Sequence, residues 1–499
     1  MMTTRLVVHF KETAAAQTAS ARLPEVTPLE RARNRVRSLS TDAGTPLTLG
    51  HQMGDGAVVV HMDRARPLAE AKALADALKR HPEVTSVGID VWVQRQAIVP
   101  NDTHYPEQWA LQSRTSGPTG TAAFSDAWDA VNPTNMGSPS VVVALIDTGR
   151  VEHEDLAANE IPGHDFVSRG TFFGVEVSGD GDGRDGNPAD PGDFCTPRGE
   201  TSSWHGLKMA SIIAAVAGNN RGIAGAAPDV RVLQVRALGR CGGWLTDVAD
   251  ALRWSAGASV SGAPVNPSAP QVKVANLSLG SVPGLNCDDG SYEYMRSAVQ
   301  SALSAGVVVV AAAGNESATS LGLPAGCQGV IAVGAHTVTG ELADYSNRNS
   351  GVMLTAPGGG CSLASNGQVC DQGIAVLGNA GVSGLGANLD LAWTGGTSAA
   401  TPFVSAAAAL MLSLDDTLTP HQVGRILTET ARPHPVGSYC ANNPGVCGSG
   451  MLDAEAAVLR VRDGPIPDNP RRSGGGGALA WGWLALLGLA VLRARRLQT

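Results

Sequence analysis

The chain has 499 residues, of which 43% are hydrophobic, 4% aromatic and 16% charged, and its formal net charge is −9. This composition excludes a collagen-like repeat, a disordered charged chain and a small disulfide-dominated domain. The negative charge argues against a nucleic-acid partner, because binding phosphates needs a basic face. The low charged fraction and the 61 glycines indicate one large, tightly packed α/β body.

The first 98 residues predict a small α+β domain. Strand-like runs at 5–10, 57–62 and 86–93 surround two helical stretches, the second of which begins near Leu68. The segment MMTTRLVVHFKE has an apolar run of only three residues after Arg5, so no export signal is visible at Met1. The pattern breaks near 97–102, where a second region begins.

From residue 99 to 462 the sequence predicts a second, larger domain. Continuous apolar strands alternating with helices indicate a parallel sheet with helices on both faces. The predicted strands lie at 141–146, 230–238, 272–279, 306–313 and 329–335, and helical stretches lie at 244–256 and 291–305.

Three reactive side chains stand where such a sheet places its active site, at the carboxyl ends of strands. Asp147 ends the run VVVALI, His205 opens the helical stretch LKMASIIAAV, and Ser398 precedes the Ala-rich helix FVSAAAALML. Taken singly, Asp147 could be a turn residue and Ser398 a helix cap. The chain order Asp, His, Ser is one of the known orders of a catalytic triad.

Four segments resemble, in order, the signature blocks of the subtilase family of serine proteases: IDTGRVEHEDL, WHGLKMASIIAA, AAAGNES and GGTSAATPFVSA. The resemblance covers about residues 100–462 and implies a subtilisin-like fold, while residues 1–98 resemble the inhibitory pro-domain of that family. The block around His205 departs from the family pattern at Leu207, Lys208, Met209 and Ser211.

The resemblance also implies a role for each site residue. Ser398 would be the nucleophile, His205 its general base, and Asp147 the group that orients the imidazole. The amide of Asn315 would stabilise the oxyanion. The residues that would wall the pocket for the substrate residue before the cut are Ser278, Leu279, Gly280, Ala312, Ala313 and Gly314.

The function implied is that of a secreted serine endopeptidase which cleaves proteins or peptides through an acyl-enzyme. It would be made as a self-processed zymogen, with its own pro-domain as inhibitor until a cut near 96–100. Two alternatives are a catalytically inactive subtilase-fold binding protein of the cell envelope and a maturation protease with one dedicated substrate.

A glycine-rich stretch at 179–187 carries three carboxylates, those of Asp180, Asp182 and Asp185. Oxygen ligands on a flexible loop suit calcium, although the spacing is not that of an EF-hand and Arg184 lowers the local negative charge. The alternatives are a structural calcium site and a solvated acidic loop. Catalysis of the implied kind needs no cofactor.

All eight cysteines lie between 195 and 447. The chain has no CxxC pair, which argues against zinc, and an even number indicates disulfides and an oxidising compartment. Eight cysteines allow 105 pairings. The resemblance to secreted Gram-negative subtilases implies sequential pairs, which are Cys195 with Cys241, Cys287 with Cys327, Cys361 with Cys370 and Cys440 with Cys447.

The C-terminal end predicts a linker at 463–477 and a hydrophobic segment with a basic tail at 478–499. Residues 478–492 are uncharged and stop at an arginine cluster, so they suit either a short membrane segment or a buried helix. Four glycines, an apolar stretch and a basic tail resemble the GlyGly-CTERM sorting tail of Gram-negative envelope proteins. That resemblance implies export, transient membrane anchoring and a rhombosortase-like processing protease, and it requires an export signal upstream of Met1.

Overall fold

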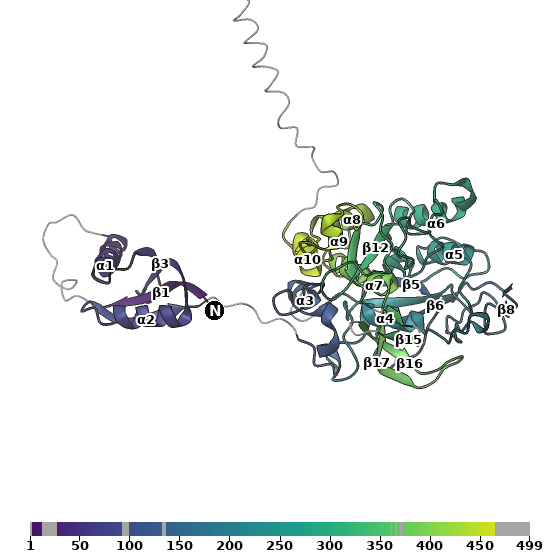
Figure 1. Cartoon of the computed structure of the whole chain (residues 1–499), viewed down its shortest axis with the longest axis horizontal. Helices are drawn as coiled ribbons and strands as arrows, with labels where there is room; N and C mark the ends of the chain where they lie inside the picture. The colour runs from purple at the N-terminus through teal and green to yellow at the C-terminus, as the bar shows by residue number, and fades with distance from the viewer. Residues whose placement is uncertain are drawn as a thin grey trace, which may run out of the picture. The chain divides into compact units, whose positions relative to one another are not determined.

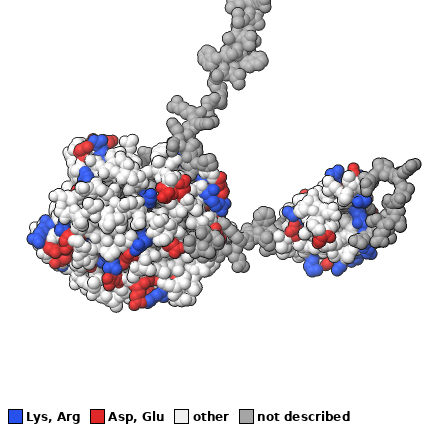
Figure 2. Space-filling model, turned by 180° about the vertical axis from the view of Figure 1, so that it is seen from behind, with Lys and Arg blue, Asp and Glu red and all other residues white. Residues whose placement is uncertain are grey.

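The computed structural model describes residues 2–11, 27–91, 99–131, 136–360, 362–364, 367–369 and 373–464. The chain divides into two compact units, Met1–Gln96 and Ala97–Thr499, shown in Figure 1. On the face shown in Figure 2, acidic and basic side chains are interspersed over both units. Each unit has its own hydrophobic core.

The N-terminal unit is a four-stranded antiparallel sheet with the strand order β2-β3-β1-β4 and two helices. Residues from both helices and from all four strands share one core, which includes Leu6, Leu39, Val60, Leu78 and Val84. The two helices therefore cover the same face of the sheet, as an α+β unit requires. The elements are β1 (Met2–Phe10), α1 (Pro28–Asp42), β2 (Leu47–Gln52), β3 (Val58–Pro67), α2 (Leu68–Leu78) and β4 (Val84–Asp90).

The larger unit is built on a seven-stranded sheet in the order β13-β12-β11-β10-β5-β9-β6, in which every neighbouring pair is parallel. This confirms the parallel α/β fold predicted from the sequence. The edge strands β6 and β13 were not predicted. The strands are β5 (Val142–Asp147), β6 (Glu160–Asp165), β9 (Arg231–Arg236), β10 (Val272–Leu277), β11 (Val308–Ala312), β12 (Ile331–His336) and β13 (Leu354–Pro357).

Alternate residues of each central strand point to opposite faces, and both faces are buried. In β5, Val143 and Leu145 belong to one core and Ala144 and Ile146 to the other. This two-sided burial is why the strands are continuously apolar rather than alternating. The first core takes α3 (Phe124–Val131), α4 (His205–Ala214), α7 (Thr397–Leu414), α8 (Pro420–Glu429) and α10 (Ala454–Arg462), and the second takes α5 (Leu245–Ser255) and α6 (Glu293–Ser304) (Figure 1).

Helix α7 is long and apolar enough to cross a membrane, but 83% of it is buried inside the protein. It is therefore the central core helix of this unit, and it is the one such helix in the part of the chain that the structure describes. The hydrophobic segment expected at 478–492 lies outside the described residues.

In its described residues the larger unit also contains three two-stranded antiparallel sheets. They are β7 (Thr171–Phe172) with β8 (Val175–Glu176), β14 (Ser362–Ala364) with β15 (Gly367–Val369), and β16 (Ile374–Asn379) with β17 (Asn388–Thr394). Short 3₁₀ segments lie at 105–107, 109–111, 196–198, 269–271 and 290–292.

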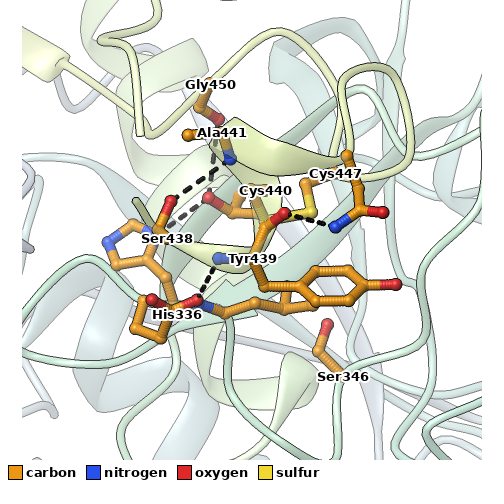
Figure 3. Close-up of a disulfide and its surroundings, with 12 residues drawn as sticks. His336, Ser346, Ser438, Tyr439, Cys440, Ala441, Cys447 and Gly450 are labelled. Atoms are coloured by element: carbon orange, nitrogen blue, oxygen red, sulfur yellow. Dashed lines mark hydrogen bonds between the residues drawn. A yellow bond between two sulfur atoms is a disulfide. The ribbon is translucent and has the colours of Figure 1, made fainter. Parts of the chain in front are cut away.

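Disulfides join Cys195 to Cys241, Cys287 to Cys327 and Cys440 to Cys447. These are three of the four pairs implied by the family resemblance, and Cys361 and Cys370 lie outside the described residues. Figure 3 shows the Cys440–Cys447 bond, in which Cys440 belongs to the short helix α9 (Tyr439–Asn442) and Ser438 is the N-cap of that helix.

Candidate active site

Asp147 and His205 form a hydrogen-bonded pair at the carboxyl end of β5. Oδ1 of Asp147 lies 2.7 Å from Nδ1 of His205 and accepts a 2.8 Å hydrogen bond from the N–H of Thr148. The His205 side chain is 24% exposed and that of Asp147 only 1%. Burial by itself lowers the pKa of His205, but the Asp147 carboxylate outweighs it, and the pKa is raised. The pair therefore presents a basic imidazole oriented by a buried carboxylate.

Two glycines let the start of α4 approach the end of β5. A Cβ atom on Gly206 would lie 2.4 Å from the carbonyl oxygen of Gly149, which no side chain could tolerate. The N–H of Gly206 donates to Oγ1 of Thr148 at 3.0 Å. His205 is the first residue of α4, so this docking sets the position of its ring against Asp147.

Ser398 lies in the first turn of α7, which begins directly after Gly396, a residue with a φ of +128°. Oγ of Ser398 donates to the carbonyl of Ser278 at 3.0 Å, and Oγ of Ser278 donates to the carbonyl of Ser398 at 2.8 Å. The second bond compensates for Pro402, which lies inside the helix and has no N–H for the Ser398 carbonyl four residues before it. Ser278 thus supplies the missing helical donor.

No hydrogen bond joins Ser398 to His205 among the residues that the structure describes. The Ser398 hydroxyl is directed at the Ser278 carbonyl, and Ser278 lines the same cavity as His205. A proton transfer between Ser398 and His205 therefore requires the hydroxyl to change its partner from this carbonyl to Nε2 of the imidazole.

Asn315 follows β11, and its side chain is anchored by Thr397. Oδ1 of Asn315 accepts hydrogen bonds from the backbone N–H of Thr397 at 2.8 Å and from its Oγ1 at 2.9 Å. Oγ1 of Thr397 also accepts from the N–H of Gly314 at 3.2 Å. Because Thr397 binds the amide oxygen, Nδ2 of Asn315 is left as the donor. This nitrogen lies near Gly396, since a Cβ atom added to Gly396 would be 3.4 Å from it.

A buried polar chain supports Ser278 from below. Nδ2 of Asn276 donates to Oγ of Ser278 at 2.9 Å, and Oδ1 of Asn276 accepts from Oγ of Ser405 at 2.8 Å. Asn276 and Ser405 are both fully buried. Because a buried polar network holds its members in one arrangement, it fixes the hydroxyl that contacts Ser398.

A cavity of about 570 Å³ opens beside His205. The predicted substrate residues Ser278, Leu279 and Gly280 line it, whereas the segment 312–314 is not among its lining residues. An added Cβ on Gly280 would lie 4.0 Å from the carbonyl oxygen of Ala312, so the two segments are neighbours. The size is within the range of ligand-binding clefts.

The strand order explains why these residues meet. β11, β10 and β5 are adjacent and parallel in the sheet, so Asn315, Ser278 and Asp147 leave it at the same edge.

The sequence profile of the subtilase family matches residues 138–462, about two thirds of the chain. The chain belongs to the subtilase family.

Relatives agree with this assignment. An extracellular protease of Xanthomonas campestris is 37% identical over 471 residues, covering 92% of this chain and 73% of the relative. An extracellular basic protease of Dichelobacter nodosus is 35% identical, and the match covers 82% of this chain but only 63% of that protein. A solved structure of a protease from Pseudoalteromonas arctica is 36% identical with a TM-score of 0.64, covering 73% of this chain and all of the other.

The residues after His205 that depart from the family pattern pack inside the core of the larger unit. Leu207, Met209 and Ser211 are all fully buried. Oγ of Ser211 donates to the carbonyl of Lys208 at 2.7 Å and accepts from the N–H of Leu377 at 3.1 Å. Burial lowers the pKa of Lys208, against an opposing effect of Asp193. The substitutions leave the contact between His205 and Asp147 intact.

In the acidic loop, for which the sequence left a calcium site and a solvated loop as alternatives, the carboxylates contact protein groups. The guanidinium of Arg236, only 1% exposed, pairs with both Asp180 and the buried Asp165. Oδ1 of Asp185 accepts the N–H of Asn187 in a local turn. Within the described ranges no group of three or more His, Cys, Asp or Glu residues is placed to hold a metal ion. Arg236 thus places a positive charge beside Asp180.

Two site residues, Thr148 and Thr397, were not predicted from the sequence. Thr148 follows Asp147, and its hydroxyl oxygen accepts the hydrogen bond that positions Gly206. Thr397 precedes Ser398, and its hydroxyl donates the hydrogen bond that positions Asn315. Their place in the motifs DTG and GTS was the available signal, but the sequence does not show that their hydroxyls point to Gly206 and Asn315.

Proposed function

We propose that this chain is a serine endopeptidase that cleaves peptide bonds through an acyl-enzyme on Ser398. In the first step, Oγ of Ser398 attacks the scissile carbonyl while its proton passes to Nε2 of His205. The imidazolium that forms is stabilised by Asp147, which already holds the other ring nitrogen at 2.7 Å. This contact between a buried carboxylate and a partly exposed imidazole is the observation that carries the proposal.

Asn315 and the start of α7 are suited to bind the oxyanion. The backbone N–H of Ser398 belongs to the first turn of a helix, where N–H groups have no intrahelical acceptor. Nδ2 of Asn315 provides a second donor because Thr397 holds the amide oxygen. Two preorganised donors stabilise the charge that develops on the carbonyl oxygen in the tetrahedral intermediate.

In the remaining steps of the cycle, His205 passes on the protons that it takes up, and both products are released. His205 gives its proton to the amine as the C–N bond breaks, which leaves the substrate acyl group on Oγ of Ser398. A water molecule then attacks the ester carbonyl while His205 takes a proton from it. His205 returns this proton to Oγ of Ser398 as the C–O bond breaks, which releases the acid product and restores the Ser398 hydroxyl. Atoms and charges balance over the cycle without a further reactant.

Labelling with a fluorophosphonate probe tests this assignment directly. The wild-type protein should be labelled once at Ser398 and should lose peptide hydrolysis in proportion. Ser398→Ala should show neither labelling nor hydrolysis, whereas Ser413→Ala, on the same helix but hydrogen-bonded to Ala409, should keep both. A folded wild-type protein that takes no label would instead support an inactive binding protein.

We also propose that residues 1–98 act as a pro-domain that inhibits the enzyme until self-cleavage near 96–100. The match to the Xanthomonas protease covers 92% of the chain, more than residues 97–499 could supply, so it extends into the N-terminal unit. Purified Ser398→Ala should remain an intact precursor. If it still matures when incubated alone, the proposed self-processing is wrong.

We further propose that the protein is exported to the cell envelope or the medium. The support is that two relatives are named extracellular proteases and that the larger unit carries disulfides, which persist in oxidising compartments. The sorting role of residues 478–499, with transient anchoring and removal by a rhombosortase-like protease, stays a prediction. Comparing the C-terminal peptide of the cellular and secreted forms by mass spectrometry would test it.

A further inference from the structure

The side-chain hydroxyl of Tyr345 contacts the backbone directly before Ser398. Oη of Tyr345 accepts a 3.0 Å hydrogen bond from the N–H of Gly396. The same oxygen lies 2.8 Å from the carbonyl oxygens of Gly358 and Gly359, so its single proton is shared between them. The ring packs against the first core of the larger unit. The phenol therefore joins the segment that follows β13 to the segment that precedes α7.

Gly396 needs such a contact because its own backbone does little to fix the chain. Its φ of +128° lies in a region that glycine alone adopts readily, and it follows a second glycine, Gly395. Glycine has the most conformational freedom to lose on folding, so neighbouring groups must hold the chain before Ser398. The carbonyl oxygen of Gly358 also accepts the N–H of Gly396 at 3.0 Å. Tyr345 binds both partners of this hydrogen bond and so fixes the turn into α7.

Asn347, two residues further along the chain, holds both chain neighbours of Asn315. Oδ1 of Asn347 accepts the N–H of Glu316 at 3.1 Å, and the backbone N–H of Asn347 donates to the carbonyl of Gly314 at 3.0 Å. Nδ2 of Asn347 donates to the carbonyl of Ala313 at 3.0 Å. The residue is only 1% exposed, and a buried polar side chain whose hydrogen bonds are made holds its partners in one arrangement. The backbone of Asn315 is therefore fixed on both sides.

One short segment thus reaches both proposed oxyanion donors. Asn347 fixes the backbone on either side of Asn315, whose Nδ2 is one donor. Tyr345 fixes Gly396, two residues before Ser398, whose backbone N–H is the other donor. A donor stabilises the oxyanion only when it is aimed at the place where the charge develops. The separation of the two donors therefore depends on where this segment holds their backbones.

We propose that Tyr345 and Asn347 are positioning residues that hold the Asn315 amide and the Ser398 N–H at the separation which one oxyanion requires. This inference rests on the proposed protease function and deepens it. Neither positioning residue is among those that line the active-site cavity, so each acts through the backbone that it holds. Thr397 joins the two donors to each other, whereas Tyr345 and Asn347 join each of them to the rest of the protein.

Tyr345→Phe tests the proposal because it keeps the ring and removes only the hydroxyl. Each variant is expressed as the full chain, kcat and KM are measured on one peptide substrate, and the concentration of active enzyme is taken from fluorophosphonate labelling of Ser398. Loss of this hydrogen-bonding group should lower kcat about fivefold and leave KM nearly unchanged. Tyr294→Phe is the matched control, since it removes the same atom from a partly buried tyrosine of α6 that packs against the second core. This control should leave kcat and KM unchanged.

A pair of inhibitors separates positioning of the donors from a general loosening of the site. A peptidyl trifluoromethyl ketone adds to Oγ of Ser398, whose proton passes to His205, and the adduct carries an oxyanion. The corresponding peptidyl alcohol binds the same cleft without forming one. In Tyr345→Phe the inhibition constant of the ketone should rise by the factor by which kcat falls, and that of the alcohol should stay the same. The acid limb of the pH profile should also stay in place, because the contact of His205 with Asp147 is untouched.

A second variant tests the role of Asn347. Asn347→Ser shortens the side chain and withdraws it from Ala313 and Glu316, so kcat should fall at least fivefold. In an Asn315→Ala background the same substitution should have almost no further effect, because the donor that Asn347 positions is gone. Tyr345→Phe should still lower kcat in that background, because it acts on the other donor.

The opposite results overturn the proposal. These are an unchanged kcat per labelled site in Tyr345→Phe, equal weakening of the ketone and the alcohol, or an Asn347→Ser effect that is as large without the Asn315 amide as with it. If Asn347→Ser does not fold, the two inhibitors measured on Tyr345→Phe decide the proposal. If the wild type is labelled and cleaves peptides while Tyr345→Phe behaves like it, only this inference fails, whereas absence of labelling in the wild type removes the proposed function as well.

Discussion

Thr397 offers a sharp test of how the oxyanion donor is positioned. Its Oγ1 donates to Oδ1 of Asn315 at 2.9 Å and accepts from the N–H of Gly314 at 3.2 Å, and the residue is fully buried. Thr397→Val keeps the shape of the side chain and removes both hydrogen bonds. The Asn315 oxygen then retains only the backbone N–H of Thr397 at 2.8 Å.

The magnitude of the effect depends on how firmly the Asn315 amide is still held. One hydrogen bond contributes about 1 kcal/mol net, which corresponds to a factor of about five. The amide would lose one of its two anchors, so kcat should fall about fivefold to tenfold with little change in KM. Complete removal of a donor of this kind costs about 10²–10³ in kcat in other proteases, and Asn315→Ala should approach that loss.

A double-mutant cycle supplies the assay. kcat and KM are measured on one peptide substrate for the wild type, Thr397→Val, Asn315→Ala and the double variant. If Thr397 acts through Asn315, its substitution should have almost no further effect in the Asn315→Ala background. An equal fall in kcat in both backgrounds, or an effect on KM alone, would refute the role of Thr397 as the positioning residue.

Three further predictions follow from charge and covalent constraint. Burial lowers the pKa of His205, but Asp147 outweighs burial and raises that pKa above its ordinary value of 6.5. Since catalysis needs the neutral imidazole, kcat/KM should fall as pH drops through this raised pKa, and Asp147→Asn should move the acid limb of the profile to lower pH. Burial raises the pKa of Asp190 to about 7, so the folded state binds a proton between about pH 4 and 7 that the unfolded state releases. The free energy of unfolding should therefore decrease as pH rises through this window, and Asp190→Asn should flatten the dependence in urea titrations at pH 5 and 8. Replacing Cys195 and Cys241 by Ser opens a loop of 46 residues and should lower the free energy of unfolding by about 4 kcal/mol on the chain-entropy account, whereas an unchanged urea midpoint would contradict it.

The site shows where prediction from the sequence ended. Asp147, His205 and Ser398 could be named because each stands at the end of a buried strand or the start of a helix, and Asn315 because the block AAAGNES resembles a signature of the family. The hydrogen bond of Ser398 to the Ser278 carbonyl could not, since it depends on a side-chain rotamer and on Pro402 leaving a carbonyl free. The pairing of Asp180 with Arg236 could not be predicted for a similar reason, because the two residues are 56 positions apart in the sequence.

The low charged fraction, the glycine content and the eight cysteines indicated one large α/β body with disulfides, and local patterns were enough for this. Continuous apolar strands determine a parallel sheet buried on both faces, and the signature blocks determine the family, because both are written in short stretches of sequence. Tertiary structure alone decided which groups approach each other across the sheet edge. The clearest example is the edge-on contact between Phe172 and Trp244, whose ring centroids are 6.0 Å apart, because the two residues are distant in the sequence and no short stretch records that they meet.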